Sequence, residues 1–191
     1  MHKRSFLISG VSLAALAVLS GGCTTSGGGA GDPEARRAAL DAEADRALSQ
    51  LFNEIRGSRE LVESARGVLV FPSVVSAGFV VGGTHGNGVL RKGGKTVRRY
   101  SMTAASVGLL AGARSKAVFY LFMIEDALRR FESSSGWQAG VDASVAVVNV
   151  GANAAVDTRS AQQPVVAFVL TNVGLMANLS MDGTRVVPLN W

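Results

Sequence analysis

Cysteine and histidine are scarce in this chain of 191 residues. Cys23 is the only cysteine, so no disulfide can form within one molecule and the fold depends on packing. The two histidines are His2 and His85, too few for a zinc site, and only His85 could serve a nucleophile as base. We therefore expect no catalytic residue, no metal, no cofactor and no enzymatic activity.

Long apolar runs are also missing. The longest near the start covers residues 11–19, well short of the roughly 20 residues that a membrane-spanning helix needs. Lys3 and Arg4 precede this run, and small residues follow it at positions 20–22. A basic start, a short apolar middle and small residues before a cleavage site predict an export signal over residues 1–22.

Cys23 stands directly after that predicted signal. The arrangement resembles a bacterial lipoprotein signal, in which the thiol receives lipid such as palmitate and the cysteine becomes the new N-terminus. The resemblance implies a lipid anchor at Cys23 on a protein of the cell envelope that faces the periplasm. Thr24, in place of an inner-membrane retention aspartate, favours the outer membrane. The alternative is an ordinary cleaved signal followed by an incidental cysteine.

Residues 3–7 are also similar to a twin-arginine export signal, with lysine in the first arginine's place. Export by the general secretory route or by the twin-arginine route therefore both stay open. Without Lys3 and Arg4, 17 basic and 14 acidic residues leave a net charge of +3. This balance and the predicted export argue against a nucleic-acid partner.

The mature chain is long enough for one domain with a core of its own. Residues 23–32 are rich in glycine, serine and threonine and predict a flexible tether behind the lipidated cysteine. Residues 33–191 then form a single domain. Apolar residues at three- and four-residue spacing predict an amphipathic helix over 33–56, and Ser58 begins a second, short helix to about residue 65.

The remainder is rich in short apolar runs typical of strands, with one further short helix over 125–131. Tight turns are predicted at Asn87-Gly88, at residues 92–95 and at Asp182-Gly183. Glycine-flanked apolar segments at 78–82, 108–112 and 174–178 indicate strong bending of the strands. The expected fold is α+β: a curved, glycine-rich antiparallel sheet, or half-closed barrel, packed with the N-terminal helix and the short helices.

The densest basic cluster surrounds the turn predicted at residues 92–95. Near an anionic bilayer each such charge contributes about 1 kcal/mol. A lipid-binding hairpin and a solvated hairpin tip are equally compatible with this pattern. The cluster consists of Arg91, Lys92, Lys95, Arg98 and Arg99.

The N-terminal helix can likewise contact lipid through Leu48, Leu51 and Phe52, or pack these residues on the sheet. Its mixed polar face and alanine-rich apolar face favour packing. The glycine-rich residues 82–88 lack the following helix that a phosphate loop needs, so a strand connection is expected, with His85 as a surface residue. Glu125 and Asp126 point in different directions on a helix and suit its N-terminus better than a paired-carboxylate site.

The sequence from about residue 40 to the end resembles the SYLF domain, a lipid-binding module of membrane-trafficking proteins and many bacterial lipoproteins. The resemblance implies affinity for anionic phospholipid in a non-enzymatic, lipid-anchored protein. A structural lipoprotein that binds an envelope protein or the cell wall is the alternative. The similar stretches are residues 65–72, 77–83, 86–90, 141–145, 174–177 and 182–184.

Overall fold

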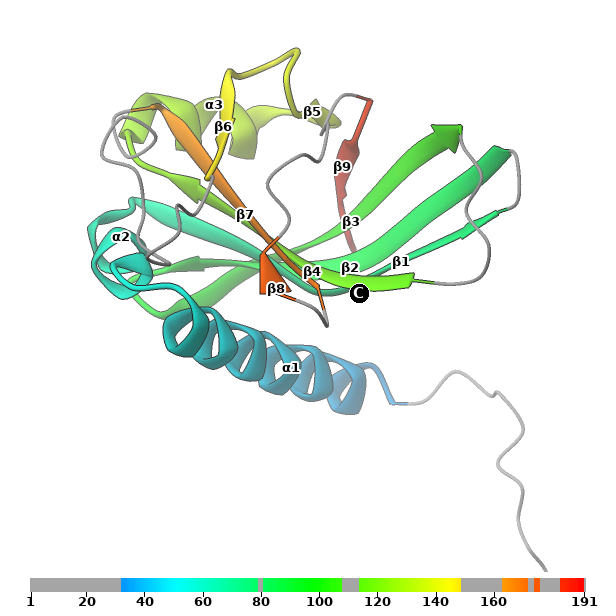
Figure 1. The fold of residues 1–191 in the computed structure, drawn as a ribbon, viewed down its shortest axis with the longest axis horizontal. Helices are drawn as coiled ribbons and strands as arrows, with labels where there is room; N and C mark the ends of the chain where they lie inside the picture. The colour runs from blue at the N-terminus through cyan, green and yellow to red at the C-terminus, as the bar shows by residue number, and fades with distance from the viewer. Residues whose placement is uncertain are drawn as a thin grey trace, which may run out of the picture. The chain divides into compact units, whose positions relative to one another are not determined.

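Three helices and nine strands make up the α+β fold in the described part of this computed structural model (Figure 1). The structure describes residues 32–78, 81–107, 114–148, 163–171, 174–175 and 183–190. All of these belong to the compact unit Gly31–Trp191. The helices are α1 (Pro33–Glu54), α2 (Ser58–Ser64) and α3 (Glu125–Ser133). The strands are β1 (Gly67–Gly78), β2 (Val81–Lys92), β3 (Lys95–Val107), β4 (Arg114–Phe122), β5 (Trp137–Gln138), β6 (Val145–Val147), β7 (Val165–Thr171), β8 (Gly174–Leu175) and β9 (Arg185–Pro188).

Helix α1 begins and ends close to the predicted limits. The Asp32 carboxylate accepts a hydrogen bond from the Glu34 backbone N–H at 3.0 Å, and Pro33 occupies the first helical position, where no N–H is needed. Gly57, with a φ of 81°, separates α1 from α2. The buried residues of α1 repeat at three- and four-residue spacing and form one face: Leu40, Ala44, Ala47, Leu48 and Leu51.

The strands form one sheet in the order β5-β9-β3-β2-β1-β4-β7-β6, with β8 paired to β7. The sheet is strongly curled into a half-barrel, which confirms the predicted curvature (Figure 1). The expectation of a wholly antiparallel sheet is wrong, because β6 and β7 run parallel. Residues 148–164 lie between these two strands, and such a long connection permits parallel pairing where a tight hairpin would not.

Each face of the sheet is covered by helices. Helices α1 and α2 cover the convex face, and α3 with β5 covers the concave face (Figure 1). Because side chains alternate along a strand, β4 contributes Phe119 and Leu121 to the convex core and Tyr120 and Phe122 to the concave core. The strands buried on both sides therefore read as continuous apolar runs.

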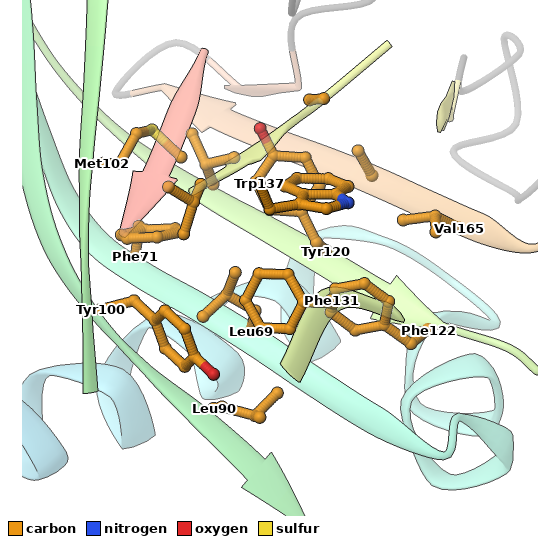
Figure 2. Close-up of a cluster of buried hydrophobic side chains, with 14 of the residues drawn as sticks. Leu69, Phe71, Leu90, Tyr100, Met102, Tyr120, Phe122, Phe131, Trp137 and Val165 are labelled. Atoms are coloured by element: carbon orange, nitrogen blue, oxygen red, sulfur yellow. The ribbon is translucent and has the colours of Figure 1, made fainter. Parts of the chain in front are cut away.

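The concave core is built around aromatic rings (Figure 2). The Trp137 ring centroid lies 5.4 Å from that of Tyr120 and 5.5 Å from that of Phe131, both in edge-to-face geometry. Phe131, from α3, also lies 4.7 Å from Phe122. Such offset and edge contacts are favourable beyond the area they bury.

The segment from β5 to β6 connects the two edges of the sheet. Trp137 of β5 pairs with β9 at one edge, and β6 pairs with β7 at the other. Residues 137–147 thus cross the opening of the half-barrel on the side of α3. This crossing brings Trp137 over the concave core.

The predicted turn at Asn87-Gly88 is wrong, because both residues lie inside β2 and residues 82–88 form strand, not a connection. A Cβ on Gly88 would lie 2.5 Å from the Phe71 ring and from the Val70 carbonyl oxygen. Glycine is therefore needed for close approach to the β1 bulge. The turn predicted at residues 92–95 is confirmed: Gly93 and Gly94, both with positive φ, connect β2 to β3.

Candidate functional site

The five cations of the predicted basic cluster lie on the β2–β3 hairpin, but the fold directs them to different faces of the sheet. Arg91 and Arg99 contact α1 on the convex face, whereas Lys92 contacts α3 on the concave face. Strand alternation produces this division. The cluster is therefore not one continuous basic patch.

Arg91 and Arg99 bind acidic residues of α1. The Arg91 guanidinium donates to the Asp45 carboxylate and, at 3.0 Å, to the Asp41 backbone carbonyl. The Asp41 carboxylate accepts from Arg99 Nη2 at 2.7 Å and from Thr96 Oγ1 at 2.9 Å. These contacts hold α1 against the hairpin.

Lys92 Nζ donates to Glu132 Oε2 of α3 at 2.7 Å. Three of the five cations are thus neutralised by helix carboxylates. Lys95 lies exposed at the turn, and the exposed Arg98 guanidinium lies 5.8 Å from the centroid of the Tyr100 ring. Lys95 and Arg98 are the members of the cluster whose charge is directed to solvent.

The apolar residues of α1 proposed to contact lipid are packed on the sheet. Leu51 is fully buried and Leu48 is 9% exposed, both within the convex core. Phe52 is half-buried, and the Arg59 guanidinium lies 4.2 Å from its ring centroid. Lipid could reach Leu48 and Leu51 only if α1 left the sheet, so their role in lipid binding stays a prediction.

The remaining candidates do not gather into a catalytic arrangement. His85 is an exposed residue of β2, and Asp126 pairs with Arg129 and Arg130 on α3. Within the described residues, no three histidine, cysteine or acidic side chains approach closely enough to hold a metal ion. None of the described helices is both long and apolar enough to cross a bilayer.

Several predictions concern residues outside the described ranges. These are the export signal, Cys23, most of the tether, residues 79–80 of the segment 78–82, the segment 108–112, residues 176–178 and Asp182. They stay predictions.

Two surface features were not predicted from the sequence. An open groove of about 630 Å³ separates α1 from the outer halves of β1 and β2, with Leu40, Glu43, Val75 and His85 among its lining residues. Lys116 lies half-buried on the concave face of β4, directly before the apolar run that predicted a strand. A cation inside a strand was the available sequence signal.

Residues 103–190 match the family described as Ysc84: Las17-binding protein actin regulator. The match is consistent with a member of the SYLF-domain family. The match covers a little under half of the chain, from within β3 to the residues after β9. It includes α3 and the concave-core rings of Tyr120, Phe122, Phe131 and Trp137, but not those of Phe71 and Tyr100. A SYLF domain is compatible with lipid binding. No curated protein matches the chain.

Proposed function

We propose that this chain is a lipid-anchored, non-enzymatic protein of the cell envelope whose SYLF domain binds anionic phospholipid. The match of residues 103–190 to the SYLF family carries this proposal. The predicted export signal and Cys23 supply the anchor, and the mild positive charge suits an anionic surface. One acyl chain gives only marginal membrane binding and further chains make it stable, so lipid contacts of the domain would orient it or engage a second lipid.

Within this proposal, the cations of the hairpin that would meet the bilayer are those without a carboxylate partner among the described residues. Arg91, Arg99 and Lys92 are held by carboxylates of α1 and α3, so their charges are already balanced. Lys95 and Arg98 keep their charge toward solvent, and each would contribute about 1 kcal/mol near an anionic membrane.

Vesicle flotation of residues 24–191, which lack the anchor, tests this function. We expect flotation with anionic vesicles at low salt, loss at high salt, and none with neutral vesicles. Lys95→Gln combined with Arg98→Gln should weaken it. The matched control is Arg56→Gln with Arg66→Gln, which removes two exposed charges elsewhere and should have less effect.

Absence of flotation on every vesicle would contradict lipid binding by the domain. The family description names binding of a protein, so a structural lipoprotein with an envelope protein partner is the second candidate. That function predicts a specific crosslinked partner in cells. It also predicts that the partner is lost when an exposed surface is altered, whatever the lipid composition.

A further inference from the structure

The side chains on the concave face of β4 change from apolar to charged at Lys116. From the α3 end, the side chains on this face are Phe122, Tyr120, Val118 and then Lys116. The first three belong to the fully buried core. The interior of the half-barrel is therefore aromatic at one end and cationic toward the other.

One hydroxyl-bearing residue pairs with Lys116 in the sheet, and two more lie further along the same face. Lys116 pairs with Thr171 of β7 on one side and with Val74 of β1 on the other. Nearer the end of β1 and the start of β2, Ser76 Oγ and Thr84 Oγ1 are hydrogen bonded at 2.9 Å. Because each hydroxyl has one proton and two lone pairs, one of these two keeps its proton for another acceptor.

Lys116 differs from the other half-buried cations of the described residues. Arg91, Lys92 and Arg99 each contact a carboxylate, whereas no acidic side chain in the described part of the chain pairs with Lys116. Burial lowers the pKa of the Lys116 ammonium group. Withdrawal from water disfavours the charged form, and a bound anion would favour it again.

We propose that Lys116 and the neighbouring hydroxyls of the concave face bind a phosphate group. The ammonium group supplies the charge, and the hydroxyls donate hydrogen bonds to phosphate oxygens. Phosphate is common to phospholipid headgroups and to inorganic phosphate. A lipid source rests on the proposed function, whereas the phosphate site itself does not. The site lies toward the end of the sheet where β1, β3 and β7 finish.

The unit Gly31–Trp191 contains every element and both cores described above, so it is the protein to test. NMR of the lysine side chains should show inorganic phosphate raising the pKa of Lys116 while leaving Lys95 unchanged. Binding should weaken as pH rises through the folded-state pKa of Lys116, because the neutral amine no longer attracts the anion. An unchanged Lys116 resonance at saturating phosphate would overturn the site.

A vesicle arm identifies the source of the phosphate. Lys116→Met should bind vesicles containing phosphatidic acid about fivefold more weakly or worse, the loss expected for one charge-assisted hydrogen bond. Arg66→Gln is the control for loss of one exposed charge outside the hairpin. The thermal midpoint of Lys116→Met should be no lower than that of the unaltered domain, since a half-buried unpaired cation is removed.

The two proposals fail separately. Equal vesicle binding by the unaltered domain and Lys116→Met, without a phosphate effect on Lys116, refutes the site and leaves lipid binding intact. A phosphate effect on Lys116 without vesicle binding supports the site and refutes lipid binding by the domain. If Lys116→Met does not fold, Lys116→Gln replaces it, and the NMR titration of the unaltered domain decides independently.

Discussion

A single residue, Gly88, allows β2 to approach β1 closely. Gly88 faces the β1 bulge between Val70 and Ser73, where the Phe71 ring occupies the space that a side chain would take. Phe71 is fully buried and touches other core residues, so it has little room to move. Glycine at this position is a requirement of packing, not of turn formation.

Gly88→Ala should therefore destabilise the domain by about 2–3 kcal/mol through overpacking. The free energy of unfolding in urea measures the change. Gly83→Ala in the same strand is the control, because a Cβ there meets no atom within 4 Å. Its effect should stay within about 0.5 kcal/mol. Equal losses for the two variants would show that strand propensity, and not the contact with Phe71, sets the cost.

At the scale of elements, α1 is attached to the sheet by both apolar and charged contacts. Leu51 is fully buried, whereas Asp41 and Arg99 keep 34% and 19% of their side-chain surface exposed. Partly exposed ion pairs contribute little because water screens them. Burial should hold the helix in place, and the ion pairs should set its position over the hairpin.

Leu51→Ala should cost about 2–4 kcal/mol of stability, by lost burial and a residual cavity. A double-mutant cycle of Asp41→Asn and Arg99→Gln should give a coupling of about 0.5–1 kcal/mol. Urea unfolding measures both. If Asp41→Asn alone destabilised the domain as much as Leu51→Ala, the ion pairs would be the principal attachment of α1.

At the scale of the whole domain, Trp137 connects distant parts of the sheet. It pairs with Val186 of β9 at one edge, and its ring packs on Tyr120 of β4 and Phe131 of α3. The next residues reach β6 at the opposite edge. The ring therefore helps to keep the half-barrel curled.

Trp137→Ala should lower stability by about 3–5 kcal/mol, as expected for removal of a fully buried aromatic side chain. Hydrogen exchange should accelerate in β9 and β6 more than in the central β1 and β2, because the edges lose their connection. Val97→Ala, at a side chain 51% exposed, is the control and should have little effect. Uniform acceleration throughout the sheet would argue against a local role at the edges.

Local sequence signals predicted the helices well. Asp32, Pro33 and the spacing of Leu40 to Leu51 depend on contacts within a few residues, and α1 follows them. Asn87-Gly88 wrongly predicted a turn. Glycine is needed at position 88 because of its contact with Phe71, which forms only in the folded sheet. Local patterns and tertiary packing use the same residue types for different purposes.

The candidate site was predicted only in part. The hairpin at residues 92–95 and its cations could be identified from charge and turn residues. Their partners Asp41 and Glu132 lie roughly 40 or more residues away along the chain. The neutralisation of Arg99 and Lys92 could therefore not be identified from the sequence. A cation that the sequence alone leaves free to bind a ligand can be paired with a distant carboxylate in the fold.

The sequence by itself determined the helical segments and the β-rich remainder, because periodicity, capping and composition act over short distances. The likeness to the SYLF family was also visible in the sequence, as similar stretches of residues. Only the tertiary structure decided the parallel β6–β7 pair, the burial of Leu48 and Leu51, and the position of Lys116 away from the acidic side chains that the structure describes. These features depend on strand order and curvature, which bring together residues that are far apart in the chain.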